Sequence, residues 1–320
     1  MTVIHVTRRL PADVERVLTE RHGARLNPSD APLERAQLAK ALCEADILVP
    51  TITDRIDADL LATPGRRVRL IANYGAGVDH VDLTAARAAG IAVTNTPDAL
   101  TEATAELAIL LMLMAARRAG EGERELRAGD WTGWRPTHLV GNGLHGRVLG
   151  LVGFGRIARA TAAKARGLGM TIRYLNRSPV DPAVTGPLAA EPVATIEELA
   201  GIADVVSLHT PGGAGTRHLI DRDVLRAMRP HAVLVNTARG SVIDEDALVA
   251  ALDAGWIGAA ALDVYAREPA IHPGLLTHQR SVLLPHLGSA TIEARTAMGM
   301  QAIANIEAFL AGSELPNHVA

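Results

Sequence analysis

Three ionisable side chains in the second half of the sequence could together carry out acid–base chemistry on a small substrate that has a carbonyl beside a carboxylate. Arg239 offers a planar cation that matches a carboxylate with two hydrogen bonds, and His286 can donate a proton to a carbonyl oxygen. Glu268 can keep that imidazole charged. Each follows a predicted strand, and ligands of an open parallel sheet bind at the carboxyl ends of its strands. We therefore expect the three side chains to converge.

Taken singly, each of these residues has a structural alternative. Arg239 could form a structural ion pair, Glu268 could be a turn residue, and His286 could be a packed imidazole at a strand end. The catalytic interpretation rests on their occurrence together with a cofactor motif. No metal site is predicted, because the other histidines lack metal-ligand spacing and Cys43 has no second thiol.

The cofactor motif is the segment GLVGFGRIA, residues 150–158, between an apolar predicted strand and an amphipathic predicted helix. Gly153 permits a tight turn, Gly155 lets the backbone approach a pyrophosphate, and Ala158 lets the helix close on the strand. The helix N-terminus then meets the phosphate charge. This strand, turn and helix context predicts a dinucleotide site.

The next predicted strand ends at Asn176, Arg177 and Ser178, where an acidic residue would normally hold the ribose 2′-hydroxyl of NAD. Asn176 carries no charge that would repel a 2′-phosphate, and the other two residues supply a cation and a hydroxyl donor. We therefore predict that NADP(H) is preferred and that NAD(H) is possible. The alternative is that Arg177 is a solvated charge, or stacks on adenine, and that both cofactors work.

Short β-branched segments alternate with amphipathic ones throughout, which predicts an α/β protein of two doubly wound domains. The predicted strands are 3–7, 47–50, 69–73, 92–95, 148–152, 171–175, 205–209, 232–236, 259–264 and 282–285. The predicted helices are 12–21, 33–43, 82–88, 156–168, 221–228, 245–254 and 291–310, together with one long helix from Thr101 to about Gly120 that could bridge the domains. Residues 129–146 lack a clean period and are predicted to form a structured loop or arm.

Length and composition exclude several classes of protein. A chain of 320 residues is long enough for two domains, each with its own core. A net charge of −3, without a basic cluster, gives no reason to expect a nucleic-acid partner. The most apolar stretch, 107–116, is about half the length of a bilayer span, and no export segment opens the sequence. We expect a cytoplasmic protein without a membrane partner.

Five segments in order resemble the signatures of the D-isomer-specific 2-hydroxyacid dehydrogenases, and within that family those of the glyoxylate/hydroxypyruvate reductases. They are 73–79, 150–158, 236–244, 262–269 and 285–291. The resemblance covers nearly the whole chain. It implies a Rossmann cofactor domain, residues 100–287, inserted into a flavodoxin-like substrate domain, residues 1–99 and 288–320.

The resemblance also implies roles for individual residues. His286 would be the general acid in reduction and Glu268 its hydrogen-bonded partner, while Arg239 would bind the substrate carboxylate. The backbone N–H groups of Ala76 and Gly77 would complete the carboxylate site, beside Tyr74. The cofactor contacts that it implies, besides the residues named above, are Thr104, Arg156, Ile157, His209, Thr210, Thr216, Thr237, Ala238, Asp263 and Gly288.

Trp134 gives a hypothesis about assembly. In the reductases that this sequence resembles, the matching aromatic residue comes from the neighbouring subunit and borders the substrate pocket, which would make the protein a homodimer. The alternative is that Trp134 only anchors a loop on the dimer surface.

Two other functions remain open at this stage. Another dehydrogenase of the same family, acting on phosphoglycerate, lactate or formate, is one. The other is a nucleotide-sensing binding protein, like the transcriptional corepressors that reuse this fold, since fold alone does not give function.

Overall fold

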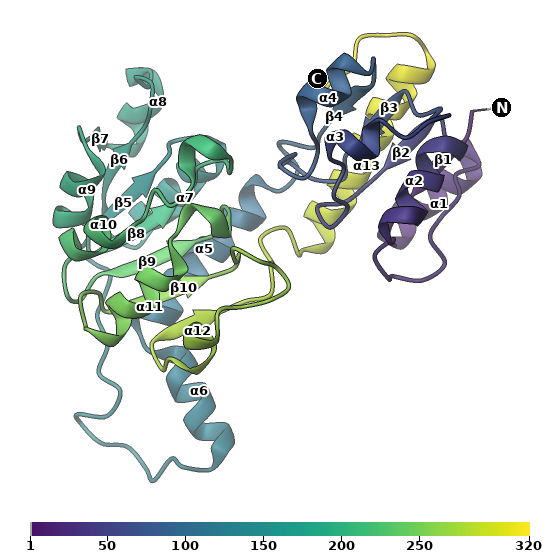
Figure 1. Ribbon diagram of the computed structural model, residues 1–320. Helices are drawn as coiled ribbons and strands as arrows, with labels where there is room; N and C mark the ends of the chain where they lie inside the picture. Colours follow the sequence, from purple (N-terminus) through teal and green to yellow (C-terminus); the bar gives the residue numbers. More distant parts are fainter. Residues whose placement is uncertain (1) are drawn as a thin grey trace. The chain divides into compact units, whose positions relative to one another are not determined.

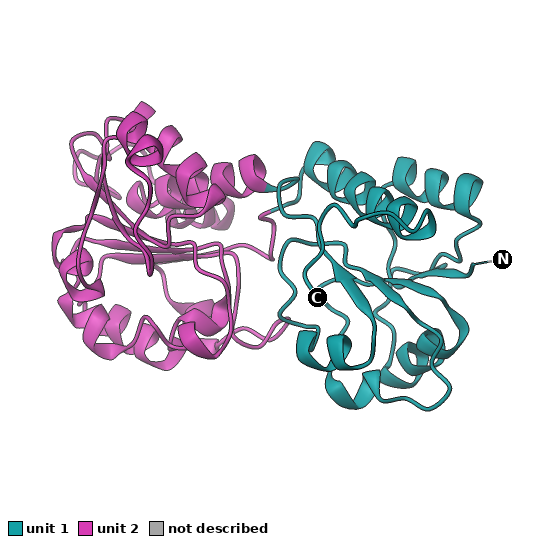
Figure 2. Ribbon diagram, turned by 90° about the horizontal axis from the view of Figure 1, so that it is seen from above, with its two compact units in different colours: residues 1–100, 289–320 teal, residues 101–288 magenta. Residues whose placement is uncertain are grey.

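The structure is a computed structural model that describes residues 2–320 (Figure 1). The chain forms two compact units, coloured separately in Figure 2. Unit 1 comprises Met1–Leu100 and Ser289–Ala320, and unit 2 comprises Thr101–Gly288. Each unit has a parallel sheet of its own, which confirms the predicted α/β class.

The sheet of unit 1 has the strand order of a flavodoxin-like fold. Its four parallel strands lie in the order β1 (Ile4–Val6), β2 (Ile47–Val49), β3 (Leu70–Ala72) and β4 (Ala92–Thr94). Arg25 pairs with the outer edge of β1, where its carbonyl accepts a hydrogen bond of 2.9 Å from the Val6 N–H. Counted as the second strand in sequence, this bridge gives the order 2-1-3-4-5.

The helices of unit 1 enclose this sheet together with the last segment of the chain. They are α1 (Ala12–His22), α2 (Arg35–Glu44), α3 (Ala58–Leu61), α4 (Leu83–Ala88) and α13 (Ile292–Leu310). Helix α13 contributes Met298, Ile303 and Ile306 to the core around β1 and β3. The last residues also pair with the sheet, since the Val93 N–H donates to the Ala320 carbonyl at 2.6 Å. Residues 289–320 are therefore part of the core of unit 1.

The sheet of unit 2 has the strand order of a Rossmann fold. Its seven strands are β5 (Val148–Val152), β6 (Thr171–Leu175), β7 (Ala190–Pro192), β8 (Val205–Leu208), β9 (Val233–Asn236), β10 (Ala259–Leu262) and β11 (Ser281–Leu283). All neighbours are parallel, in the order β11-β10-β9-β8-β5-β6-β7. The order reverses between β5 and β8, and this switch point is where an open α/β sheet binds its ligand.

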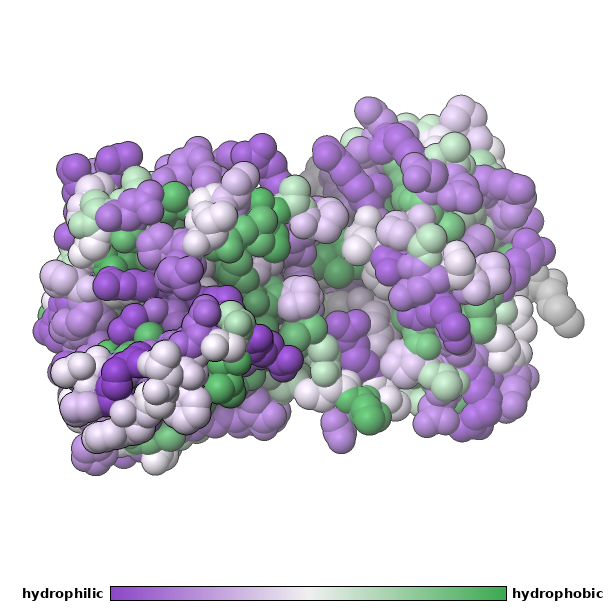
Figure 3. All heavy atoms as spheres, turned by 90° about the horizontal axis from the view of Figure 1, so that it is seen from below, coloured by the Kyte–Doolittle hydropathy of each residue, from purple (hydrophilic) through white to green (hydrophobic). Residues whose placement is uncertain are grey.

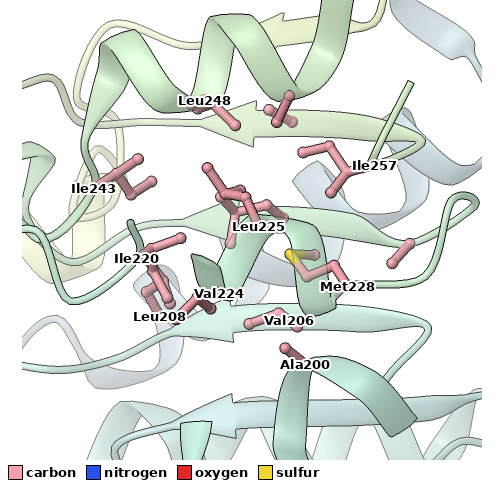
Figure 4. Packing of buried hydrophobic residues seen from close by; sticks show 14 of the residues in the cluster. Ala200, Val206, Leu208, Ile220, Val224, Leu225, Met228, Ile243, Leu248 and Ile257 are labelled. Atoms are coloured by element: carbon pink, nitrogen blue, oxygen red, sulfur yellow. The ribbon is translucent and has the colours of Figure 1, made fainter. Parts of the chain in front are cut away.

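Helices cover both faces of the unit 2 sheet. The helices of unit 2 are α5 (Thr101–Ala116), α6 (Ala119–Ala128), α7 (Arg156–Gly167), α8 (Pro182–Thr185), α9 (Ile196–Ile202), α10 (Arg222–Ala227), α11 (Glu245–Asp253) and α12 (Pro273–Thr277). On one face, Val206 and Leu208 of β8 pack with Val224, Leu225 and Leu248 (Figure 4). On the other face, α5 and α7 form a second core. Burial on both faces explains why these strands are continuous apolar segments.

One element prediction was wrong. The single helix predicted from Thr101 to about Gly120 is two helices, because Arg118 adopts a left-handed conformation with φ of 55° and interrupts the helical path. The Asn142 N–H then donates to the free Ala116 carbonyl at 2.8 Å. No side chain of α6 is buried, and Figure 1 shows this helix projecting from the unit 2 sheet.

Among residues 2–320, no helix combines the length and apolarity that a membrane span requires.

Candidate active site

The carboxyl ends of three adjacent strands in unit 2 carry the residues that the sequence singled out. Arg239 follows β9, Glu268 follows β10, and His286 follows β11. The Nδ1 atom of His286 and the Oε2 atom of Glu268 lie 2.8 Å apart, and their side chains are 32% and 34% exposed. Glu268 accepts a hydrogen bond from Nδ1 of His286, so Nε2 is the ring nitrogen that is left to meet a substrate.

Two hydrogen bonds hold the carboxylate of Glu268. It accepts from His286 at Oε2 and from the Tyr265 N–H at Oε1, the latter at 3.0 Å. Burial acts to raise the pKa of Glu268, but the hydrogen bonds and the nearby charges of His286 and Arg239 outweigh it and lower the pKa. Arg239 is therefore close enough to act electrostatically on Glu268.

Asp263 fixes the backbone that carries His286. Its Oδ1 accepts from the Leu287 N–H at 2.6 Å and its Oδ2 from the Gly288 N–H at 2.8 Å, while its carbonyl accepts from the His286 N–H at 2.9 Å. His286 has a φ of 54°, a conformation that is uncommon outside glycine. Asp263 is fully buried, and burial raises its pKa. The sequence pointed to Asp263 as a cofactor contact, but not to this role in holding the His286 loop.

Asn236 and Gly240 shape the loop that carries Arg239. The Asn236 side chain accepts from the Ala238 N–H and donates to the Arg239 carbonyl, both at 2.9 Å. A Cβ on Gly240 would lie 1.9 Å from the backbone carbon of Tyr265, so only glycine lets this loop and the loop after β10 approach so closely. Close contact between the two loops brings the guanidinium near the Glu268 and His286 pair.

The glycine turn after β5 fits a dinucleotide pyrophosphate. Gly153 has a φ of 88°, and a Cβ there would lie 2.7 Å from the His209 carbonyl oxygen. A Cβ on Gly155 would meet no atom within 4 Å, so space is open at the N-terminus of α7, which has no side-chain cap. Open space at a helix N-terminus without a side-chain cap is what an anion requires there, and Arg156 and Ile157 are the first two residues of α7.

Buried hydroxyl groups at the same edge of the sheet support this fit. The Oγ1 atoms of Thr210, after β8, and Thr237, after β9, are buried and have no hydrogen-bond partner among the described residues. Buried polar atoms are normally paired, so these two oxygens are free for a ligand. His209 beside them contacts the Ser207 hydroxyl at 2.9 Å, and burial lowers the pKa of His209 to about 4.

Other predicted cofactor residues make contacts within the protein. Thr104 donates to the Gly288 carbonyl at 3.0 Å, and Thr216 donates to the Pro211 carbonyl at 2.7 Å. Asn176 uses both ends of its amide, since it accepts from the Phe154 N–H and donates to the Ser178 carbonyl. Arg177 and Ser178 are exposed beyond the end of β6.

The loop after β3 in unit 1 carries the other predicted substrate contacts. The ring of Tyr74 is buried, and its hydroxyl donates to the Arg295 carbonyl at 2.6 Å. Among the described residues, no hydrogen bond engages the N–H of Ala76 or Gly77, although the carbonyls on either side are all bound. These two N–H groups are therefore available to an anion.

Apolar side chains are exposed on α6 and on the arm that follows it. Trp134 is 83% exposed and Trp131 is 51% exposed, and Leu126 and Val140 are similarly exposed. Figure 3 shows the molecule from the side on which α6 projects, and apolar residues are scattered there among hydrophilic ones.

Within residues 2–320, no group of three or more histidine, cysteine or acidic residues is arranged to hold a metal ion.

Comparison with known proteins agrees with the fold. Residues 109–288 match the family described as D-isomer specific 2-hydroxyacid dehydrogenase, NAD binding domain. The chain is 40% identical to the glyoxylate reductase of Thermococcus litoralis over 99% of this chain and 96% of that protein.

Two solved structures cover nearly the whole chain. A glyoxylate reductase from Paecilomyes thermophila has a TM-score of 0.88 and 34% identity, over 99% of this chain and 98% of that one. An NADPH-dependent glyoxylate/hydroxypyruvate reductase from Sinorhizobium meliloti, in complex with NADP and malonate, has a TM-score of 0.87 and 34% identity. The match covers 100% of this chain and 97% of that one. On its sequence and its fold, this chain belongs to the D-isomer-specific 2-hydroxyacid dehydrogenase family.

Proposed function

We propose that this protein is an NAD(P)H-dependent reductase that converts glyoxylate or hydroxypyruvate into the corresponding D-2-hydroxy acid. The observation that carries the proposal is the 2.8 Å contact between His286 and Glu268, made beside Arg239 at the carboxyl ends of β9, β10 and β11. Full-length relatives named glyoxylate reductase support the choice of substrate.

The proposed mechanism assigns one task to each side chain. Arg239 binds the substrate carboxylate through its planar fork. The N–H groups of Ala76 and Gly77 are likewise proposed as donors to a carboxylate. His286 donates the proton on Nε2 to the carbonyl oxygen, and Glu268 stabilises the charged imidazole before that transfer. The nicotinamide cofactor, when bound, supplies the hydride that adds to the carbonyl carbon. The hydride and the proton together convert the keto acid into the hydroxy acid.

In this proposal the cofactor lies across the glycine turn of unit 2, with its pyrophosphate at the N-terminus of α7. The exposed Arg177 and Ser178 would then meet the ribose 2′-position, and we infer a preference for NADP(H) over NAD(H). The Sinorhizobium meliloti relative, whose structure contains NADP, supports this inference. The predicted division into a substrate domain (1–99 and 288–320) and a cofactor domain (100–287) is part of the proposal, as are the homodimer and the cytoplasmic location.

A substrate panel tests the proposal. The purified protein is assayed with NADPH and with NADH against glyoxylate, hydroxypyruvate, pyruvate and phosphohydroxypyruvate, and for formate oxidation with NADP+ and NAD+. We expect the highest kcat/KM with glyoxylate or hydroxypyruvate and NADPH. Faster turnover of any other substrate would replace the proposed one, and a higher kcat/KM with NADH would reject the NADP(H) preference. Binding of NADPH without any turnover would favour a nucleotide sensor.

A further inference from the structure

Two asparagine side chains in unit 1 hold the loop that presents the N–H groups of Ala76 and Gly77. Asn73 donates from Nδ2 to the Gly75 carbonyl and to the Gly77 carbonyl, both at 2.9 Å. Asn95, directly after β4, donates from Nδ2 to the Ala76 carbonyl at 2.7 Å. Three successive carbonyls of the loop are therefore bound by two side-chain amides.

Fixing these carbonyls also fixes the direction of the neighbouring N–H groups. A trans peptide is planar, so its C=O and N–H point in opposite directions. The carbonyl of Gly75 shares a peptide plane with the N–H of Ala76, and the carbonyl of Ala76 shares one with the N–H of Gly77. The amides of Asn73 and Asn95 lie on the carbonyl side of these planes, so both N–H groups face away from them.

His80 determines which end of the Asn73 amide faces the loop. The Nε2 atom of His80 lies 3.0 Å from the Oδ1 atom of Asn73. An amide oxygen can only accept, so Nε2 must carry the proton in this pair. If the amide turned over, its oxygen would face two carbonyl oxygens at 2.9 Å and its NH2 would face a donor. Asn73 is only 1% exposed, so water does not substitute for these partners.

We propose that Asn73 and Asn95, with His80 orienting the first of them, form an amide clamp that positions the Ala76 and Gly77 N–H groups for the substrate carboxylate. These are positioning residues, since they act on the substrate only through the backbone that they hold. The inference rests on the proposed function, because it takes a carboxylate as the ligand of the loop. It assigns a positioning role to three residues for which the sequence predicted no role.

Steady-state kinetics of three variants tests the amide clamp. Asn95→Asp replaces the donor with an oxygen that repels the Ala76 carbonyl, and His80→Leu removes the donor to Asn73. We expect the KM for glyoxylate to rise roughly tenfold or more in each, the effect of losing about one charge-assisted hydrogen bond. The inhibition constant of oxalate should rise in parallel, while the KM for NADPH stays unchanged and kcat at saturation changes much less.

His80→Gln is the matched control, because its side-chain amide can offer an N–H donor at a similar reach. We expect it to recover most of the affinity for glyoxylate that His80→Leu loses. The two variants alter different side chains of the amide clamp, so one folded variant is enough for a result.

Two outcomes separate the amide clamp from the proposed function. If the wild-type protein reduced no 2-keto acid, the proposed function would be rejected. If the wild type were active and Asn95→Asp and His80→Leu kept its KM for glyoxylate, the amide clamp would be rejected. An equal rise of KM in His80→Gln and His80→Leu would reject the role of His80 as the donor.

Discussion

At the scale of single residues, the contact between His286 and Glu268 joins a proton donor to a group that holds it in place. Glu268 accepts a hydrogen bond from Nδ1, and Asp263 fixes the backbone of residues 286–288 through three hydrogen bonds. The imidazole is thus held from both ends, and its Nε2 atom keeps one direction. A proton donor that is held in this way loses little entropy when the substrate binds.

The first prediction concerns turnover. His286→Ala should bind NADPH with the affinity of the wild type and lose at least about 100-fold in kcat, the lower range for general acid catalysis. Glu268→Gln should lose less, because the amide can still accept from Nδ1 but carries no charge. Fluorescence titration with NADPH and steady-state assays measure the two quantities. A His286→Ala variant with wild-type kcat would contradict the assignment of the acid.

The second prediction concerns pH and stability. The pKa of Glu268 is lowered in the folded protein, so its ionised form stabilises the fold above the ordinary value of about 4.5. That contribution is lost as the pH falls through the lowered pKa. The wild type should therefore have a higher free energy of unfolding than Glu268→Gln. This difference should be largest above pH 4.5 and should shrink as the pH falls below 4.5. Denaturant unfolding at several pH values measures this, and a difference that grows toward acid pH would contradict it.

The third prediction concerns the choice of cofactor. Arg177→Ala should raise the KM for NADPH roughly tenfold, because an exposed Arg and phosphate pair contributes on the order of 1–2 kcal/mol, and should leave the KM for NADH unchanged. Arg166→Ala, another exposed arginine of unit 2, serves as the control. Equal effects on the two cofactors would show that Arg177 contacts a part that both share.

At the scale of elements, the parallel sheet of unit 2 brings together residues that lie far apart along the chain. Residues 239, 268 and 286 follow three neighbouring strands, so their loops open at one edge. This convergence was predictable from the sequence, because apolar strand segments and the residues after them are visible there. The loop contacts at Gly240 and Asp263 were not, because they depend on the packing of segments 25 residues apart.

Other elements were missed for similar physical reasons. The short strand β7 and the short helices α3, α8 and α12 have too few residues to show a period. The break at Arg118 falls on a residue that is neither glycine nor proline, and it depends on an arm that returns to cap Ala116. Asn73 and Asn95 each follow a strand directly, and this was their only signal in the sequence. The contact of His80 with Asn73 was not predictable, because it depends on the conformation of the loop between them.

The fourth prediction tests the contact between two loops. Gly240→Ala would force the loop after β9 away from Tyr265 and should destabilise the protein by about 3 kcal/mol or more, the upper range for overpacking. Gly167→Ala is the matched control, because a Cβ at the end of α7 would meet no atom within 4 Å and should be neutral or slightly stabilising. Thermal and denaturant unfolding compare the two. Equal stabilities would contradict the close packing at Gly240.

At the scale of the whole molecule, the exposed side chains of α6 and the arm favour a second copy of the chain as their partner. Four exposed apolar residues on one helix and the arm that follows it, among them a tryptophan that is 83% exposed, are uncommon on a protein that stays monomeric. The homodimer remains a prediction, and so does the entry of Trp134 into the partner's active site.

The fifth prediction uses a mixture of variants. The wild type should sediment as a dimer, and Trp134→Ala should raise the KM for glyoxylate. If Trp134 serves the partner's site, a heterodimer of Trp134→Ala and His286→Ala subunits contains one intact site, so mixing under subunit exchange should restore activity at low glyoxylate. If heterodimers form but activity is not restored, Trp134 serves the active site of its own subunit. A stable, fully active monomer would reject the shared site.

The division of unit 1 between the two ends of the sequence has a consequence for biogenesis. Unit 2 is one uninterrupted stretch with a complete sheet, so a nascent chain can fold it as soon as Gly288 has left the ribosome. The opening 100 residues emerge earlier but must wait for Met298, Ile303, Ile306 and Ala320 before their own core is closed. During synthesis, the segment of the protein that is made first is therefore the last to close its core.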